Sequence, residues 1–295
     1  LVQGDTASVF MGSLTALFEG VGVGHVEAGL RSRHPGLPYP DPYPEEMFRR
    51  LTGVLTLHHF APTREARDNL LAEGVPPDRI HLTGNTVVDA LHEAARVPHQ
   101  PSNPGLREAL SAGARLILLT AHRRESFGEP LREVFSAVRE LVDEDRGIRV
   151  LYPVHPNPQV VGPAREILSD HPRIHLTEPM GYLDLVTALR RATMVLTDSG
   201  GIQEEAPTFG VPVLILREAT ERPEGVEAGV ARLVGTGRER ILAECRKILA
   251  RPGPRTDPDR GLNPYGDGQA GRRIADIVVS SLNGCPRRTS DWDGP

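Results

Sequence analysis

The sequence is poor in cysteine: it has two, Cys245 and Cys285, among 295 residues. Two cysteines this far apart indicate neither a disulfide framework nor a metal site, which needs closely spaced ligands. No apolar run approaches the roughly 18 residues that a membrane-spanning helix needs. The chain also lacks a GxGxxG fingerprint and any credible His/Cys/Asp metal spacing. We therefore expect no metal, no nicotinamide and no other cofactor.

An excess of charge of one sign is missing too. The chain has 34 Lys and Arg against 39 Asp and Glu, a net charge of −5. This balance does not indicate a nucleic acid or a membrane surface as partner. No signal-peptide pattern is visible, so the cytoplasm is the expected location. The length favours two domains, and 30 Gly and 27 Pro supply many turns.

Short apolar runs alternate with helical segments along the whole chain. This alternation is typical of βαβ units and predicts an α/β protein with parallel sheets. Helices are expected at 7–19, 62–73, 87–95 and 269–282. The expected strands lie at 23–27, 54–60, 80–83, 116–120, 148–154, 174–176, 194–197, 213–216 and 232–234.

Residues 97–113 are rich in Pro, Gly and Ser and show little periodicity, which predicts a linker. It would separate a first domain, 1–96, from a second, 114–268. The helix at 269–282 is expected to pack back on the first domain, and 283–295 to form a disordered tail. Leu1 to Gln3 resembles the end of a strand, which indicates that the sequence is a fragment.

The most informative stretch runs from Thr197 to Leu214. A buried strand is followed by Ser199-Gly200-Gly201, which opens a short acidic helix. Such a turn leaves backbone N–H groups available for a diphosphate. Glu204 and Glu205 could then reach the hydroxyls of a ribose. An ordinary turn whose carboxylates complement the helix dipole explains the same residues, and both interpretations stay open.

Three carboxylates follow strands or begin a helix in the first half: Asp5, Glu27 and Glu45. Asp5 could be a helix N-cap, and Glu45 could form a surface ion pair with Arg49 four residues later. Three carboxylates that converge would instead suit proton transfer to and from a substrate.

The second half contributes cations and donors at strand ends. His122 and Arg123 follow one apolar strand, and arginines at a loop tip suit phosphate or another anion. A solvated loop is the alternative. His155 follows the next strand, where a histidine has a raised chance of a functional role. Arg222 lies in a further turn, Thr220 to Glu224.

With these motifs in order, the chain resembles the non-hydrolysing bacterial UDP-N-acetylglucosamine 2-epimerases from Val2 to about Ala275. The motifs that carry the resemblance are Gly4-Asp5-Thr6, His25-Val26-Glu27-Ala28-Gly29-Leu30-Arg31, Pro44-Glu45-Glu46, Gly84-Asn85-Thr86-Val87-Val88-Asp89, His122-Arg123-Arg124-Glu125, Tyr152-Pro153-Val154-His155-Pro156-Asn157, Asp198 to Pro207, Thr220 to Glu224 and Asn263 to Gly268.

The resemblance implies a glycosyltransferase-B-like fold, in which two Rossmann-like domains with parallel sheets face each other across a cleft. It also implies an isomerase that interconverts UDP-GlcNAc and UDP-ManNAc by eliminating UDP to 2-acetamidoglucal and adding it back. A homodimer is expected.

The resemblance also assigns roles to residues. Asp5, Glu27 and Glu45 match the acidic catalytic positions, and His155 matches the essential histidine. The remaining implied roles are UDP binding by Ser199, Gly200, Gly201, Glu205 and Arg222, and binding of phosphate or of an allosteric UDP-GlcNAc by Arg49, His122 and Arg123.

Some features depart from the family. The family's N-terminal Gly-Thr-Arg-Pro-Glu motif is absent, together with the first few βα units. We expect that roughly 90 residues are missing, about half of a typical domain. The loop from Arg31 to Glu45 is longer than expected, and Phe48 stands where the family usually has Asn. A hydrolysing epimerase, a glycosyltransferase of the same fold and an inactive fragment that binds nucleotide sugars therefore remain as alternatives.

Overall fold

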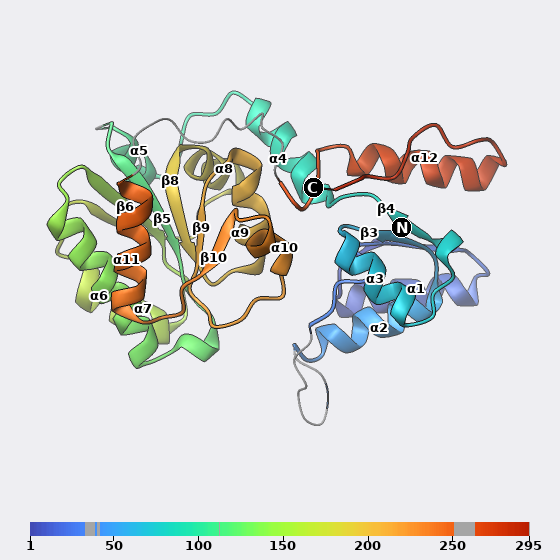
Figure 1. The fold of residues 1–295 in the computed structure, drawn as a ribbon, viewed down its shortest axis with the longest axis horizontal. Coiled ribbons are helices and arrows are strands. Elements are labelled where there is room, and N and C mark those ends of the chain that lie inside the picture. The colour runs from blue at the N-terminus through green and yellow to red at the C-terminus, as the bar shows by residue number, and fades with distance from the viewer. Residues whose placement is uncertain (33–38, 40–41, 112, 251–262, 295) are drawn as a thin grey trace. The chain divides into compact units, whose positions relative to one another are not determined.

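The computed structural model describes residues 1–32, 39, 42–111, 113–250 and 263–294. Parts of the long loop (33–38 and 40–41) and of the predicted second domain (251–262) lie outside the described residues. The chain divides into unit 1, Leu1–Ala90 with Pro264–Pro295, and unit 2, Leu91–Asn263 (Figure 1). Within the described ranges, no helix has the length and apolar character needed to cross a membrane.

Unit 1 contains a parallel sheet of four strands in the order β1-β2-β3-β4. Because the order follows the chain and crossovers share one hand, the connecting helices α1 to α3 lie on one face. Helix α12 covers the other face (Figure 1). The bounds are β1 Val2–Gln3, α1 Ala7–Phe18, β2 Val23–Val26, α2 Glu45–Leu55, β3 Thr56–Ala61, α3 Arg64–Ala72, β4 Ile80–Leu82 and α12 Ala270–Asn283. Helix α4, Thr86–Arg96, contains the boundary between the units.

Both faces of this sheet are packed. Phe60 on β3 is fully buried and packs with Ile274 and Ile277 of α12. Full burial of such side chains contributes about 1.5–3 kcal/mol each. On the α3 side a second cluster joins the strands, α3 and the chain's C-terminal segment; its members are Ala28, Leu30, Ala61, Ala66, Leu70, Ile80, Leu82 and Trp292.

The prediction of a disordered tail is wrong for the described residues 284–294. The Trp292 amide donates to the Leu82 carbonyl at 2.9 Å, and the Asp291 carboxylate accepts from the Leu82 amide at 3.3 Å. These bonds satisfy backbone groups on the open side of β4, an edge strand. The Trp292 side chain is 9% exposed. A single buried aromatic side chain anchors this segment. One residue produces no hydrophobic periodicity, so the sequence pattern did not predict the contact.

Unit 2 contains six parallel strands in the order β10-β9-β8-β5-β6-β7. Counted from β5, this is the order 3-2-1-4-5-6 of dinucleotide-binding folds, and it reverses between β5 and β8. The bounds are α5 Pro104–Leu110, β5 Arg115–Thr120, α6 Glu129–Glu144, β6 Ile148–Pro153, α7 Pro158–Leu168, β7 Ile174–Thr177, α8 Tyr182–Arg191, β8 Ala192–Thr197, α9 Gly200–Glu205, β9 Val213–Ile215, α10 Pro223–Glu227, β10 Ala231–Leu233 and α11 Arg238–Leu249, with short 3-10 turns at Pro77–Arg79, Arg124–Ser126 and Ala206–Phe209.

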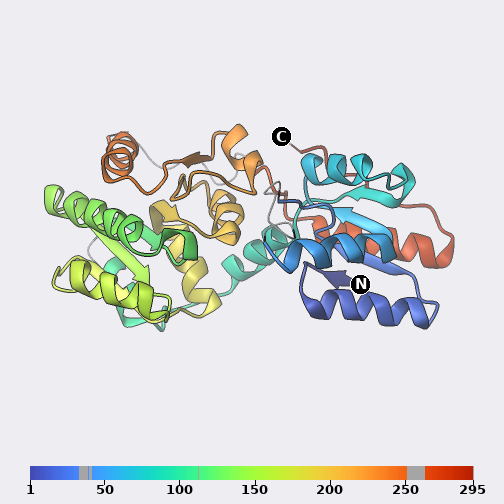
Figure 2. The same cartoon turned by 90° about the horizontal axis from the view of Figure 1, so that it is seen from below.

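The central strands of unit 2 are buried on both faces, as in other parallel sheets. Leu116 to Leu119 of β5 are each at most 1% exposed. Helices α6 and α7 run side by side over one face (Figure 2), and α11 packs next to α6. Helices α5 and α8 pack on the other face. The candidate site loops therefore follow well-packed central strands.

The segment predicted as a linker, 97–113, contains α5 and belongs to unit 2. Asn103 caps this helix, accepting from the Leu106 amide at 3.0 Å, and Pro104 occupies its first position. Asn followed by Pro starts this helix, although the Pro-rich composition of the segment predicts a linker. Asp184 of α8 holds the segment by accepting bonds from the Ser102 and Asn103 amides. The boundaries between units fall at 90/91 and 263/264 rather than at 96/97 and 268/269.

Candidate active site

Two of the three predicted carboxylates lie at the same edge of the unit 1 sheet. Asp5 follows β1 and Glu27 follows β2, and these strands are neighbours. The Gln3 side chain donates to Glu27 Oε1 at 2.9 Å. A Cβ placed on Gly4 would lie 4.0 Å from Glu27 Oε2. The turn that carries Asp5 therefore passes beside the Glu27 carboxylate.

Glu27 has a backbone conformation that side chains rarely adopt. Its φ is +66°, and it is the one non-glycine residue with positive φ in the part of the chain that the structure describes. Such a conformation costs on the order of 1–3 kcal/mol and is concentrated at functional sites. The next residue, Ala28, donates its amide to Phe60 O at 3.1 Å, which holds the turn against β3.

Asp5 is not a helix cap. The N-cap of α1 is Thr6, and Asp5 forms an ion pair with Arg49 of α2. Arg49 is 8% exposed and also donates to Leu30 O at 3.1 Å. The predicted surface pair of Glu45 with Arg49 is replaced by this contact. Glu45 is half-buried at the first position of α2, one turn before Arg49.

His25 supports the turn that carries Asp5 by a bond to its backbone, a role that the sequence did not predict. Its Nε2 lies 2.8 Å from Gly4 O, so Nε2 must carry the proton and donate it. The pKa of His25 is lowered to about 4: burial is the largest cause and Arg49 and Arg31 contribute, while the bond to Gly4 and the charge of Asp5 oppose the shift. The ring is therefore neutral near pH 7 and acts as a fixed donor. The only sequence feature that pointed to this role was the position of His25 in the same motif as Glu27.

The unit 2 candidates come from three adjacent strands. His122 and Arg123 follow β5, His155 follows β6, and Ser199 follows β8 shortly after its end. The strand order reverses between β5 and β8, which is where doubly wound sheets bind ligands. The structure thus brings together the residues that sequence spacing predicted at strand ends.

Asp198 organises this edge, a role that no motif in the sequence predicts. It is fully buried, and its Oδ2 accepts from the amides of His122 and Arg123 at 2.7 and 2.8 Å. Its Oδ1 lies 3.4 Å from His122 Nδ1. One carboxylate therefore ties the loop after β5 to the end of β8.

His122 and His155 stack, with ring centroids 5.3 Å apart and planes 12° apart. Burial lowers the pKa of His122; Asp198 opposes this, and His155 and Arg123 add to it. His155 is exposed, and its Nδ1 accepts from the Asn157 amide at 3.2 Å. Because Nδ1 accepts this bond, Nε2 is the ring nitrogen that can donate to a ligand.

The glycine turn and its acidic helix converge with these groups. Ser199 is the N-cap of α9, and its amide donates to Thr197 Oγ1 at 2.9 Å. A Cβ placed on Gly200 would lie 4.0 Å from Arg123 Nη2, and one on Gly201 would lie 3.6 Å from Glu205 Oε1. Backbone amides, a guanidinium and a carboxylate thus surround one short turn.

The two adjacent glutamates of α9 differ. Glu204 is 6% exposed and pairs with Arg222. Burial, with the neighbouring Glu204 charge, raises the pKa of Glu205 to about 7. Among the described residues, nothing hydrogen-bonds the buried Glu205 Oε2. Such an unsatisfied buried acceptor requires an explanation, and a ligand hydroxyl would supply one.

Arg222 lies in the turn before α10. Its amide donates to Thr220 Oγ1 at 3.1 Å, and its side chain pairs with Glu204. Thr220 in turn donates to the buried Gln203 of α9 at 2.6 Å. Arg222 therefore fastens the turn to α9, a contact that the motif alone did not indicate.

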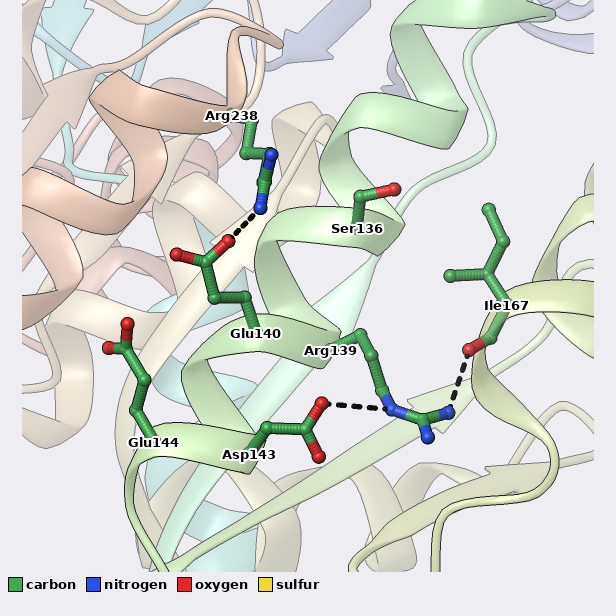
Figure 3. Close-up of a pocket in the computed structure, with 7 residues that line it drawn as sticks. All are labelled: Ser136, Arg139, Glu140, Asp143, Glu144, Ile167 and Arg238. Atoms are coloured by element: carbon green, nitrogen blue, oxygen red, sulfur yellow. Dashed lines mark hydrogen bonds and ion pairs between the residues drawn. The ribbon is translucent and has the colours of Figure 1, made fainter.

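A hollow on unit 2 lies elsewhere. It is lined by the second half of α6, the end of α7 and the start of α11 (Figure 3). Its charges neutralise one another: Arg139 pairs with Asp143, and Arg238 with Glu140. None of the predicted site residues lines it. Within the described ranges, no group of three or more His, Cys, Asp or Glu side chains could hold a metal ion.

Comparison with known proteins agrees with this geometry. A family model described as UDP-N-acetylglucosamine 2-epimerase matches residues 1–279. The chain belongs to the UDP-N-acetylglucosamine 2-epimerase family. A UDP-N-acetylglucosamine 2-epimerase of Bacillus subtilis is 47% identical over 279 residues, 95% of this chain and 71% of that protein. The predicted resemblance is confirmed at the level of the family.

Solved structures of similar chains carry nucleotide ligands. A complex of S. aureus MnaA with UDP is 41% identical, with a TM-score of 0.88 over 99% of this chain and 78% of that one. A UDP-GlcNAc 2-epimerase of Neisseria meningitidis bound to UDP-GlcNAc is 37% identical, with a TM-score of 0.78 over 96% of this chain and 76% of that one. The predicted fold class, α/β of the glycosyltransferase-B type with parallel sheets, is confirmed for this epimerase family member.

Proposed function

We propose that the protein interconverts UDP-GlcNAc and UDP-ManNAc without net hydrolysis, by eliminating UDP to 2-acetamidoglucal and adding it back. Membership of the epimerase family supports the activity, and the UDP-GlcNAc complex of a relative supports the substrate. One structural observation supports the chemistry most: Asp5 and the strained Glu27 lie together at the ends of adjacent strands.

The C2 hydrogen of the sugar is not acidic, because no carbonyl lies beside C2. The reaction therefore needs a base at C2, an acid on the opposite face and donors that stabilise the departing diphosphate. A base removes the C2 proton, and the C–H electron pair forms the C1–C2 double bond. The C1–O bond breaks with its pair going to UDP, which leaves as an anion. On return, UDP attacks C1 while an acid protonates C2 on the opposite face. Positioned carboxyl groups are suitable acids and bases.

Unit 1 would supply the proton-transfer groups Asp5, Glu27 and Glu45. Arg49 would orient Asp5, since the two are paired. The alternative role of Arg49 in binding phosphate or an allosteric nucleotide sugar stays a prediction.

Unit 2 would hold UDP. Ser199 and the amides of Gly200 and Gly201 would contact the diphosphate, with Arg123 beside them. Glu205 would accept the ribose hydroxyls, and Arg222 would brace α9 through Glu204. His155, stacked on His122, would donate to the departing diphosphate, and donors aimed at developing charge lower a barrier. Binding of phosphate by His122 itself stays a prediction.

Product analysis tests this proposal. With UDP-GlcNAc as the only sugar, we expect UDP-ManNAc at equilibrium and no accumulation of free sugar. Free ManNAc with stoichiometric UDP would identify a hydrolysing epimerase. Transfer to an added acceptor would identify a glycosyltransferase. UDP binding without turnover would leave a binding protein.

Substitution tests the carboxylates. Asp5→Asn, Glu27→Gln and Glu45→Gln should each slow epimerisation by about 100-fold or more, the usual contribution of a general acid or base. UDP binding, measured by calorimetry, should stay within about twofold because unit 2 holds the nucleotide. Glu19→Gln, at an exposed position after α1, is the matched control. A carboxylate variant with the parental rate would lose its catalytic assignment. The expected homodimer and cytoplasmic location stay predictions.

A further inference from the structure

The five residues from Glu27 to Arg31, here the Glu27 segment, connect β2 to the loop before α2. Three surrounding elements hold this segment. From the sheet, Phe60 O accepts the Ala28 amide at 3.1 Å. From α2, Arg49 donates to Leu30 O at 3.1 Å. Further contacts come from α3 and its C-cap, which carry none of the predicted site residues.

Two polar side chains of α3 and its C-cap bind the segment directly. Asn69 Nδ2 donates to Gly29 O at 3.0 Å. Glu73 accepts two bonds from Arg31, from Nε and Nη2, each 2.7 Å long. Asn69 and Glu73 are four residues apart and therefore share one side of the helix. A bidentate Arg–carboxylate pair fixes orientation as well as distance.

The fit between α3 and the segment is close. A Cβ placed on Gly29, whose φ is +84°, would lie 2.1 Å from Ala66 O of α3. The Arg31 side chain in the pair with Glu73 is only 6% exposed. The helix backbone therefore touches the segment two residues after Glu27, and the bonds from Asn69 and Glu73 hold it there.

We propose that Asn69 and Glu73 are positioning residues, which hold Glu27 in the backbone conformation that its catalytic role requires. This inference rests on the proposed function of Glu27. A positive φ persists only where the surroundings enforce it. Without the bonds from α3, the Glu27 segment would relax toward common backbone angles and carry the carboxylate away from the substrate. A displacement of about 1 Å can cost roughly 100-fold in rate.

The test combines hydrogen exchange with steady-state kinetics on three variants. Asn69→Asp keeps the shape but removes the donor to Gly29. Glu73→Gln removes the charge that Arg31 contacts. Asp68→Asn is the matched control, because Asp68 is an exposed residue of α3 whose carboxylate accepts from the adjacent Arg67. The emission of Trp292, the chain's single tryptophan and buried in the same unit, verifies folding.

We expect amides of the Glu27 segment, including Ala28, to exchange at least tenfold faster in both test variants. The kcat should fall about 10- to 100-fold, while KM and the Kd for UDP stay within about twofold. The control should match the parent in every measurement. This split separates positioning from loss of stability, which would lower the folded fraction and leave the rate per folded molecule unchanged.

Unchanged exchange in the Glu27 segment would overturn the inference, and so would faster exchange with an unchanged kcat. If Asn69→Asp fails to fold, Glu73→Gln decides alone. If the parent protein shows no turnover at all, the proposed function fails. The exchange rates alone then support or overturn the claim that α3 holds the segment.

Discussion

Single residues at this site differ most in which of their polar atoms are already bonded. Glu204 and Glu205 are neighbours in one motif, yet Glu204 pairs with Arg222 while Glu205 has a buried oxygen that no described residue satisfies. The resemblance to the family assigns the ribose contact to Glu205. The pairing of Glu204 with Arg222, in a distant turn, supports that choice and is a contact that the motif does not predict.

We therefore predict that Glu205→Ala weakens UDP binding more than Glu204→Ala does. A hydrogen bond to a charged acceptor contributes about 1.5–3 kcal/mol, which is roughly a tenfold to hundredfold change in Kd. Isothermal calorimetry measures both variants. Equal losses would contradict the assignment of the ribose contact to Glu205.

The raised pKa of Glu205 gives this prediction a pH signature. Only the carboxylate accepts two hydroxyl bonds, and burial raises its pKa to about 7 in the free protein. Affinity for UDP should be full above pH 7 and fall by up to tenfold per pH unit below it. UDP itself titrates in acid, so Glu205→Gln is the control that should lose the Glu205 part of this dependence. An identical pH profile for parent and Glu205→Gln would contradict the account.

At the scale of elements, apolar runs predicted most strands. They did not predict two segments that are held by a few specific contacts, helix α5 and the C-terminal segment. Predicted and observed strands agree closely, for instance 116–120 with β5 Arg115–Thr120. Buried parallel strands are continuous apolar runs and are easily recognised. Helix α5 was not predicted because its N-cap, Asn103, is followed by a proline in a Pro-rich segment. The ordered C-terminal segment was not predicted because one side chain, Trp292, and backbone bonds to an edge strand hold it.

The C-terminal segment offers a test at this scale. Trp292→Ala should lower the free energy of unfolding by about 3–5 kcal/mol, as for other buried large aromatics. Chemical denaturation followed by circular dichroism measures the change. Val279→Ala on α12, 49% exposed, is the control and should change it by less than about 0.5 kcal/mol. A Trp292→Ala protein as stable as the control would show that the segment contributes nothing to unit 1.

For the whole molecule, β-α alternation predicted the α/β class, and the chain length together with the Pro-, Gly- and Ser-rich segment predicted two domains. The rule that parallel strands present their carboxyl ends at one edge then placed the candidate residues. It could not supply the side-chain contacts. Three supporting contacts join segments far apart in sequence: His25 with Gly4, Asp198 with the His122 amide, and Asn69 of α3 with Gly29. Spacing along a chain does not encode such bonds.

The central claim is that this family member moves a proton at C2 of its sugar substrate. We would incubate the protein with UDP-GlcNAc in heavy water and follow the sugar by proton NMR and mass spectrometry. The account predicts UDP-ManNAc with deuterium at C2, since the abstracted proton exchanges with solvent before UDP returns. UDP-ManNAc that retains the original hydrogen at C2, or the absence of UDP-ManNAc, would contradict it.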